Sequence, residues 1–384
     1  MEIDAKKYPL ISSDSHVFEP PTLWTDRIKG YDDVPRMSRV GDHDDWVLGG
    51  RTLCGTGVAA NAGLRLEDPS QMKILGLFDD VPRAAYDPDE RLHAQDVDGV
   101  AAEVLYATVG LMLYGQVRDS SFFSALCRAY NDWLAEFCAT HPKRLLGMAM
   151  INTDDPASAV EELERARNMG LIGALIPVYP KWDLLYDRPE YENLWAAASD
   201  LEAPLALHVT TIRPGPLEGF SFEFPPLLTP RFLTSLDYWV KLSLADFILS
   251  GVFERHPKLH VGSVEHDLGW IPYFLYQLDY TYTDRMRRPH WPPKFKSDLL
   301  PSDYFRSNVF CSFQEDPQGI ADRYIIGVDS LMWGSDYPHP ESTYPKSVEI
   351  TDRVLAGVPT PEREQILGGN CAKLFGLESL LVND

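Results

Sequence analysis

Two polar residues near the N-terminus, Asp14 and His16, have the types and the spacing to bind a metal ion. They follow the apolar residues Leu10 and Ile11, a run that predicts a buried strand. Because alternate residues of a strand point to the same side, both side chains can reach one ion. Carboxylate oxygen and imidazole nitrogen suit zinc, manganese or iron(II). The pair alone fits a strand-end turn with a capping aspartate equally well, so the metal hypothesis needs ligands from other strands.

Further histidines and carboxylates stand at the ends of three later apolar runs. A strand at 204–208 ends in His208, a strand at 259–264 leads into Glu265, His266 and Asp267, and a strand at 330–333 leads into Asp336 and His339. In a parallel barrel the carboxyl ends of the strands share one face, so these residues become neighbours. A lone histidine at such a rim is more often a satisfied polar residue than a ligand. The convergence of four strands favours a metal site.

Three other histidines lie at the opposite ends of their strands. His141 and His256 each stand in a His-Pro-Lys turn before a predicted strand, and His260 lies at the start of one. Barrel chemistry occurs at the carboxyl ends of the strands, so we expect these three to be structural.

The elements that must position the candidate ligands alternate regularly along the chain. Strands are predicted at 8–16, 101–106, 145–150, 173–177, 204–208, 259–264, 309–312 and 330–333, and helices at 121–140, 156–169, 189–200, 239–253, 270–282, 317–326 and 346–355. Eight strands alternating with helices indicate an α/β fold, a (β/α)8 TIM barrel in a single domain spanning 1–384. Residues 21–90 have little periodicity and many turn residues, which predicts a long ordered insertion after strand one, covering the site.

Composition excludes several classes of function. The 384 residues are 45% hydrophobic and carry a formal net charge of −22, which makes a phosphate backbone an unfavourable partner. The longest apolar runs fall well short of the roughly 20 residues that span a bilayer, and the N-terminus lacks a signal-peptide pattern. Five widely spaced cysteines without a C-x-x-C motif fit reduced, buried thiols. We therefore expect a cytoplasmic protein that binds neither nucleic acid nor membranes.

Four motifs together carry a resemblance to a known family. They are D-S-H-V-F-E-P at 14–20, A-L-H at 206–208, E-H-D-L-G-W-I-P at 265–272 and G-S-D-Y-P-H at 334–339. The chain resembles the amidohydrolase-related proteins of the group that contains aminocarboxymuconate-semialdehyde decarboxylase, gamma-resorcylate decarboxylase and 5-carboxyvanillate decarboxylase. The resemblance implies a metal held by Asp14, His16, His208 and Asp336, with His266 as the catalytic imidazole.

The resemblance also indicates which metal ion to expect. An acidic residue at position 14 leans toward manganese, with zinc and iron as alternatives. No lysine follows the fourth strand, where Ile176-Pro177-Val178 stands, so a carbamylated lysine bridging two metals is not expected.

A second metal ion is the main alternative within the family. Glu19 and His339, with Glu341 close by in sequence, could hold a second ion, as in dinuclear relatives that activate oxygen. We favour the alternative in which Glu19 caps the turn before Pro20 and His339 contacts the substrate or supports a ligand. Glu265 and Asp267 are expected to orient His266 or a loop rather than to bind metal.

The same residues could serve two reactions. A decarboxylase would protonate the carbon that bears the substrate carboxylate, with Asp336 or His266 holding the ring and carbon dioxide leaving. A hydrolase would use Asp336 to take a proton from a metal-bound water and His266 to stabilise the oxyanion. The resemblance favours a decarboxylase acting on a small aromatic or unsaturated carboxylic acid. The remaining alternatives are a dinuclear iron or manganese enzyme that activates oxygen and a catalytically silent scaffold subunit.

Aromatic residues beside the strand ends are candidates for the wall of a substrate pocket. They are Phe18, Trp24, Tyr106, Trp270, Phe313 and Tyr337, although most aromatics in a barrel belong to its core. Arg213 could pair with a substrate carboxylate, or be a solvated loop arginine. The partners we expect are a small-molecule substrate and further subunits, in a homodimer or higher oligomer or with a paralogous subunit.

Overall fold

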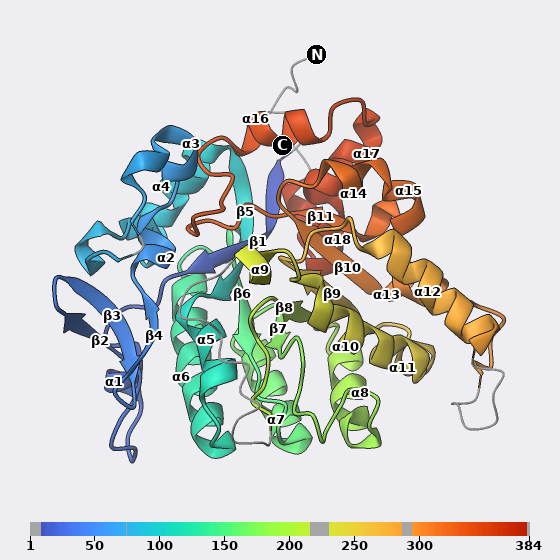
Figure 1. Cartoon of the computed structure of the whole chain (residues 1–384), viewed down its shortest axis with the longest axis horizontal. Helices are drawn as coiled ribbons and strands as arrows, with labels where there is room; N and C mark the ends of the chain where they lie inside the picture. Colours follow the sequence, from blue (N-terminus) through green and yellow to red (C-terminus); the bar gives the residue numbers. More distant parts are fainter. Residues whose placement is uncertain (1–8, 74, 216–229, 286–293, 382–384) are drawn as a thin grey trace.

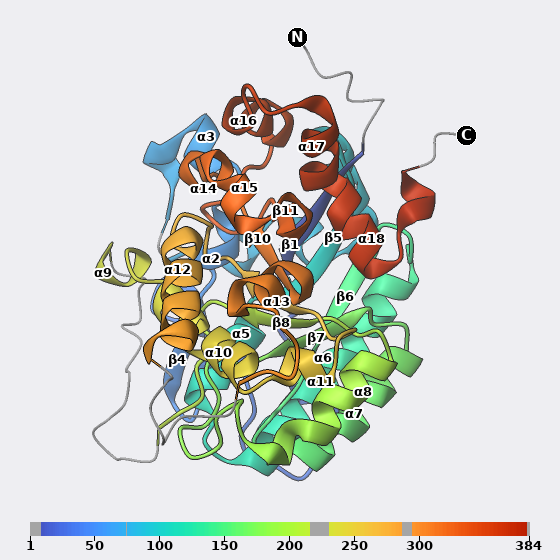
Figure 2. The same ribbon diagram turned by 90° about the vertical axis from the view of Figure 1, so that its right-hand side faces the viewer.

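Eight parallel strands occupy the centre of the computed structural model, which describes residues 9–73, 75–215, 230–285 and 294–381. They neighbour one another in chain order: β1 (Leu10–Val17), β5 (Val100–Ala107), β6 (Leu145–Met150), β7 (Gly173–Ile176), β8 (Leu205–His208), β9 (Val261–Val264), β10 (Val309–Phe313) and β11 (Leu331–Trp333). Helices surround this sheet in both views (Figures 1 and 2). The predicted (β/α)8 barrel is confirmed.

The barrel closes where the end of β1 meets the segment that follows β11, a junction of residues 12–16 and 333–337 that we call the seam. The amide of Asp336 donates to the carbonyl of Asp14 at 2.8 Å, and that of His16 to the carbonyl of Tyr337 at 2.7 Å. Gly334 permits the approach, because a Cβ there would lie 2.6 Å from the Cβ of Asp14. The seam thus brings the first and last candidate ligands side by side.

The helices follow the strands in the order that the sequence predicted, with finer divisions. They are α4 (Pro88–Asp98), α5 (Val109–Gln116), α6 (Ser120–Ala139), α7 (Pro156–Asn168), α8 (Glu192–Asp200), α9 (Pro230–Leu233), α10 (Asp237–Leu249), α11 (Val252–Arg255), α12 (Ile271–Thr283), α13 (Pro301–Asn308), α14 (Pro317–Ala321), α15 (Arg323–Ile326), α16 (Ser347–Val354), α17 (Thr360–Glu364) and α18 (Asn370–Phe375). The single helix expected at 239–253 is two, because Gly251 turns the chain with a φ of 77°. The helix expected at 317–326 is also divided, at Asp322.

The insertion between β1 and β5 is ordered and has a sheet of its own. It contains α1 (Leu23–Arg27), the antiparallel strands β2 (Arg36–Val40), β3 (His43–Leu48) and β4 (Arg51–Gly55), and the short helices α2 (Gly57–Ala60) and α3 (Leu64–Glu67). The three strands lie at the edge of the molecule beside α5 and α6 (Figure 1). Arg65 of α3 donates to Glu315 at 2.6 Å and to the carbonyl of Ser342 at 3.1 Å, in the loops after β10 and β11. The insertion therefore reaches the carboxyl-end face of the barrel.

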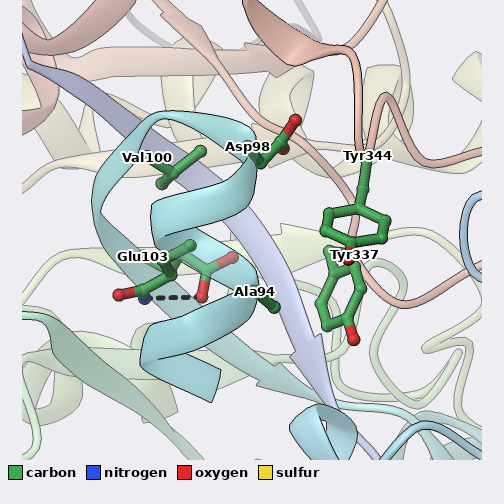
Figure 3. Close-up of a pocket in the computed structure, with 7 residues that line it drawn as sticks. Ala94, Asp98, Val100, Glu103, Tyr337 and Tyr344 are labelled. Carbon is green, nitrogen blue, oxygen red and sulfur yellow. Dashed lines mark hydrogen bonds between the residues drawn. The ribbon is translucent and has the colours of Figure 1, made fainter. Parts of the chain in front are cut away.

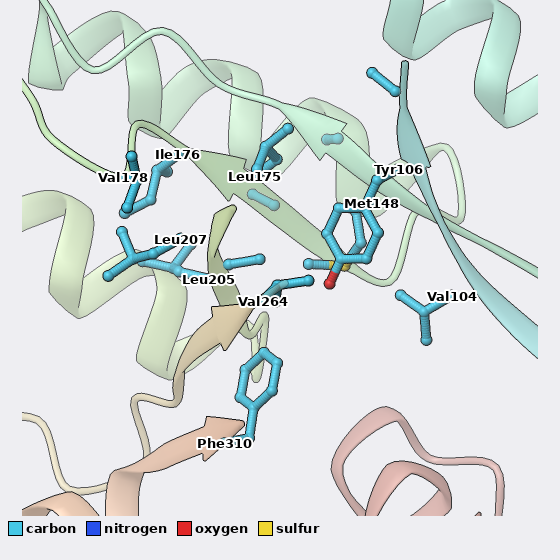
Figure 4. Packing of buried hydrophobic residues seen from close by; sticks show 14 of the residues in the cluster. Val104, Tyr106, Met148, Leu175, Ile176, Val178, Leu205, Leu207, Val264 and Phe310 are labelled. Carbon is cyan, nitrogen blue, oxygen red and sulfur yellow. The ribbon is translucent and has the colours of Figure 1, made fainter. Parts of the chain in front are cut away.

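The barrel interior below that face is apolar. Figure 4 shows the side chains of Tyr106, Met148 and Phe310, each from a different strand, directed into the space between the strands, and all three are buried. All five cysteines are buried and free, as expected. Among the described residues, no helix has both the length and the apolar character to span a bilayer.

Candidate metal centre

Four buried side chains meet at the carboxyl-end face of the barrel: Asp14 and His16 from β1, His208 from the end of β8, and Asp336 from the segment after β11. The Nε2 atom of His16 lies 3.4 Å from an oxygen of Asp14 and 3.4 Å from an oxygen of Asp336. The Nε2 atom of His208 lies 3.5 Å from the same Asp14 oxygen and 3.2 Å from Nε2 of His16. All four residues are at most 1% exposed. Ligand atoms about 2.1 Å from a shared ion stand roughly 3.4 Å apart in a tetrahedral site, so the spacing of the Asp14, His16 and His208 atoms fits one ion. Asp336 adjoins this group through His16 and forms a second group with His16 and His339.

Both histidines present the same nitrogen to the cluster. Nδ1 of His16 lies 2.7 Å from the carbonyl oxygen of Ala107, and Nδ1 of His208 lies 3.1 Å from that of Val209. A carbonyl oxygen can only accept, so Nδ1 carries the proton and Nε2 keeps its lone pair for a metal. Burial, reinforced by His339, lowers the pKa of His16 to about 3, which keeps that ring neutral at pH 7.

The carboxylates of the cluster have unused oxygens. Oδ1 of Asp14 and Oδ2 of Asp336 are buried and have no hydrogen-bond partner within the described parts of the chain. Burial opposes ionisation of Asp14, but the neighbouring His16 and His208 hold its pKa below the usual range. Burial and the nearby Asp14 raise the pKa of Asp336. Unpaired buried carboxylate oxygens are costly, and a cation bound beside them would offset that cost.

Glu265 stands closer to the cluster than the sequence suggested. Its Oε2 atom lies 3.5 Å from Nε2 of His208, and the ligand atoms of Asp14, His16, His208 and Glu265 all lie within 4.8 Å of one another. We had expected this residue to orient His266 or a loop. No periodicity marks it as a ligand, because it lies one residue beyond β9, where the backbone leaves the strand with a φ of 63°.

Left-handed backbone recurs at the strand ends of the site. Asp336 and Asp267 have φ values of 58° and 52°, and Thr210, two residues after His208, has 71°. Such conformations cost a non-glycine residue about 1–3 kcal/mol each and persist where the surroundings impose them. The chain therefore bends sharply after three of the barrel strands.

The two residues considered for a second metal ion have other partners. Glu19 is fully buried and accepts hydrogen bonds from the amides of Val109 and Gly110, both at 2.9 Å, at the start of α5. His339 contacts Asp336 through Nδ1 at 2.8 Å and the Thr108 hydroxyl through Nε2 at 3.1 Å. Glu19 therefore caps α5 rather than the turn before Pro20, and His339 supports Asp336.

His266 lies beside the cluster with one nitrogen unused. It is 3% exposed, its Nδ1 is 3.3 Å from the Ser263 hydroxyl, and its Nε2 has no partner among the described residues. Burial, with a smaller effect of His208, lowers the pKa of His266 to about 3. The Trp270 indole donates to the carbonyl oxygens of His266 and Asp267, at 3.0 and 3.1 Å, and so holds the loop that carries His266.

The expected pocket residues divide into two groups. Tyr106 lies beside the candidate site: its ring centroid is 5.2 Å from that of His208, and its buried hydroxyl has no partner in the described chain. Phe313, the last residue of β10, is 2% exposed, and its carbonyl oxygen accepts from the Gly334 amide at the seam.

Trp24 and Tyr337 pack elsewhere. The Trp24 ring contacts Trp46 edge to face at 5.2 Å, and its indole donates to the carbonyl of Leu126 on α6. The Tyr337 ring lies 4.6 Å from the Arg91 guanidinium and 4.6 Å from the Tyr344 ring. Phe18 is buried and stacks on Phe78 of the insertion. Proximity in sequence to a strand end did not distinguish these core aromatics from residues of the site.

Arg213 is neither solvated nor free to bind a substrate. It is 3% exposed, forms a two-pronged ion pair with Asp154 at 2.9 and 2.6 Å, and donates to the carbonyls of Tyr114 and Val117. Its guanidinium also lies 4.3 Å from the Phe123 ring. These contacts make Arg213 a structural link between the loops after β6 and β8.

The histidines at the opposite ends of the strands have structural partners. His141 lies 2.7 Å from a carboxylate oxygen of Asp89, and His256 lies 2.8 Å from one of Glu192. Neither belongs to the groups of described residues that could hold a metal ion.

The sequence and the fold have known relatives. A family model described as amidohydrolase matches residues 77–377. The gamma-resorcylate decarboxylase of Rhizobium sp. (strain MTP-10005) is 28% identical over 288 residues, which are 70% of this chain and 84% of that protein. A solved amidohydrolase of Mycobacterium avium subsp. paratuberculosis K-10 has a TM-score of 0.75 at 22% identity, covering 96% of this chain and 98% of that one.

A second solved structure contains a metal ion. It is a dihydroxybenzoic acid decarboxylase of Polaromonas sp. JS666 with bound manganese and the inhibitor 2-nitroresorcinol, with a TM-score of 0.65 at 20% identity, covering 97% of this chain and 98% of that one. The solved structures share the fold, and the family model spans well over half of the sequence. The chain therefore belongs to the amidohydrolase family.

Proposed function

We propose that this chain is a metal-dependent decarboxylase that acts on a small aromatic carboxylic acid of the hydroxybenzoate type. The supporting observation is the buried cluster of Asp14, His16, His208 and Asp336, in which Nε2 of His16 lies 3.4 Å from both carboxylates and one oxygen of each aspartate is unpaired. Manganese is our preferred ion, because two carboxylates with two imidazoles suit it and because the Polaromonas relative holds it. Glu265 is a further candidate ligand, through Oε2.

The residues around the cluster support the reaction type. The Rhizobium relative is named as a decarboxylase, and Asp336 and His266 each have one unpaired buried atom available to a substrate. A divalent ion in the cluster would supply positive charge that orients the substrate carboxylate or a neighbouring hydroxyl oxygen. Asp336 is our candidate acid, because its Oδ1 is held by His339 while its Oδ2 is free.

The proposed reaction balances with one proton per turnover. Asp336 gives its proton to the ring carbon that bears the carboxylate, which breaks aromaticity. The bond between that carbon and the carboxylate then breaks, its electron pair restores the ring, and carbon dioxide leaves. Neutral His266 holds the substrate by a hydrogen bond through Nε2. Asp336 ends as a carboxylate and takes up a proton before the next turnover.

We propose that the insertion at 21–90 covers the mouth of the barrel. Arg65 ties it to Glu315 and Ser342, which follow β10 and β11. A cover of this kind excludes water, which favours decarboxylation over hydrolysis because water is the co-substrate of the second reaction.

The test is to follow carbon dioxide release by mass spectrometry from hydroxybenzoates and enol-acids, using metal-loaded and metal-depleted protein. We expect release from at least one hydroxybenzoate with the loaded protein only, and none with His208→Ala. Failure of every acid to release carbon dioxide with fully loaded protein would refute a decarboxylase. Water-derived ¹⁸O in a cleaved product would instead indicate the hydrolase.

A further inference from the structure

Arg91, on α4, lies against the seam although it is far in sequence from every candidate ligand. It is fully buried, and its Nη1 donates to the carbonyl of His16 at 2.7 Å. Its Nη2 donates to the carbonyl of Tyr337, the residue after Asp336, at 3.3 Å. One side chain therefore contacts the backbone of both ligand-bearing segments.

The seam needs such a contact because regular pairing ends before it. Strand β11 stops at Trp333, three residues before Asp336. Beyond that point, the Asp336 amide donates to Asp14 and the His16 amide donates to the Tyr337 carbonyl that Arg91 also uses. The guanidinium is a rigid planar fork, so its two nitrogens hold the two carbonyls at a fixed separation.

Arg91 is itself fixed from two directions. Its Nε donates to Glu103 of β5 at 2.6 Å, and Gln95 of α4 donates to the same Glu103 oxygen at 2.7 Å. Its guanidinium also lies 4.6 Å from the Tyr337 ring. Figure 3 shows Glu103 and Tyr337 among the side chains beside α4, with the Gln95–Glu103 hydrogen bond dashed.

A buried ion pair of this kind is a weak source of net stability, because desolvation cancels most of the attraction between the charges. What the Arg91–Glu103 pair provides is a fixed geometry, at a place where two segments that carry candidate ligands meet without a regular ladder.

We propose that Arg91 is a positioning residue of the metal centre, which sets the separation of His16 and Asp336 by bridging the carbonyls of His16 and Tyr337. The inference rests on the proposed metal site and adds a residue that touches neither metal nor substrate.

The experiment measures metal affinity and coordination geometry in variants. Arg91→Lys keeps the charge but loses the fork, and Glu103→Gln removes the charge that fixes Arg91. In each we expect the dissociation constant for manganese, measured by calorimetry on metal-depleted protein, to rise about 10–100-fold, as when residues that support metal ligands are changed. We also expect the visible absorption of the cobalt-substituted protein to shift, because the ligand separation changes.

The matched control is Asn370→Ala. Asn370 also bridges two backbone carbonyls, those of Val328 and Leu331 at 2.8 Å each, but at the other end of β11. This variant should lower the melting temperature and leave the manganese affinity and cobalt spectrum unchanged.

The outcomes separate the inference from the function on which it rests. A folded Arg91→Lys or Glu103→Gln protein with manganese affinity within about twofold of wild type and the wild-type cobalt spectrum would overturn the inference alone. A wild-type chain that takes up neither ion would overturn the proposed function and the inference with it.

Discussion

At the scale of single residues, the site depends on nitrogen and oxygen atoms that are buried and left unpaired. His16 and His208 are held through Nδ1 by backbone carbonyls, so their free Nε2 atoms face the carboxylates of Asp14 and Asp336. His266 differs, because it belongs to neither group of described side chains that could hold a metal ion, and its Nε2 is unpaired. We infer from this difference that His266 acts on the substrate and not on the metal.

His266→Ala should therefore keep the metal and lose activity. The variant removes a hydrogen-bonding group from the substrate side without removing a ligand, so we expect about one ion per chain and a kcat lower by about 10²–10⁴-fold. Metal analysis and carbon dioxide release on one preparation provide the check. An undiminished rate would remove the imidazole from the mechanism.

Residue types and order in the sequence located the candidate ligands, and their partners could not be read from it. The spacing of Asp14 and His16 predicts that their side chains share one side of a strand. In the structure, Nε2 of His16 lies 3.4 Å from Oδ1 of Asp14. Glu265 was interpreted as a supporting residue because nothing in the sequence reveals its left-handed backbone. For Arg213 the sequence suggests a partner of a substrate carboxylate or a solvated loop arginine, because its partner in the structure, Asp154, is 59 positions away.

At the scale of secondary-structure elements, the seam between β1 and β11 is the critical junction. A Cβ on Gly334 would lie 2.6 Å from the Cβ of Asp14 and 2.8 Å from the Ser312 hydroxyl, so the strands must separate to admit one. The site thus depends on a glycine that touches no ligand atom.

Gly334→Ala should destabilise the fold and weaken metal binding together. Overpacking of this kind costs about 1–3 kcal/mol, and here the displaced residue is Asp14. Urea unfolding and manganese titration measure the two effects. In the control Gly269→Ala, the nearest atom, an Asp316 oxygen, would be 3.6 Å away, an ordinary contact. Equal losses of stability and manganese affinity in both variants would show that the close approach at the seam does not cause them.

The type of an element could be predicted where the pattern of apolar residues was clear. The prediction failed where that pattern was weak. Most barrel strands are largely apolar runs, as buried parallel strands are, whereas β1 is apolar only at its two ends. The insertion's strands β2 to β4 were missed because their small sheet includes charged residues such as Arg36, Arg39 and Arg51. Helix α5 was missed because its eight residues are almost uniformly apolar, without a polar face to show a period.

At the scale of the whole molecule, a buried acid links the end of α4 to the start of α16. Asp98 is 4% exposed and accepts hydrogen bonds from the amide and hydroxyl of Ser347, at 2.9 and 2.6 Å. Burial nonetheless raises the pKa of Asp98 from 3.8 to about 7.

This pKa has a consequence for the stability of the protein. Between pH 3.8 and about 7 the folded chain holds a proton that the unfolded chain has released, so this group's contribution to the free energy of unfolding falls as the pH rises. Asp98→Asn removes the effect. The stability of wild type minus that of the variant should decrease across this window, by up to about 4 kcal/mol.

Urea unfolding at several pH values provides the measurement. The exposed residue Asp79 supplies the control. The free energy of unfolding of Asp79→Asn should differ from that of wild type by a constant amount at every pH. A wild-type minus Asp98→Asn difference that stays constant from pH 4 to pH 7 would contradict the assigned pKa.

The central claim is that side chains spread from Asp14 to Asp336 hold one cation, and the metal content of the purified chain tests it most directly. After loading with manganese and removal of free ion, we predict about one ion per chain in wild type and a large loss in His208→Ala, because each ligand is essential to a site of this size. Less than roughly a tenth of an ion per wild-type chain, or an unchanged content in His208→Ala, would contradict the account.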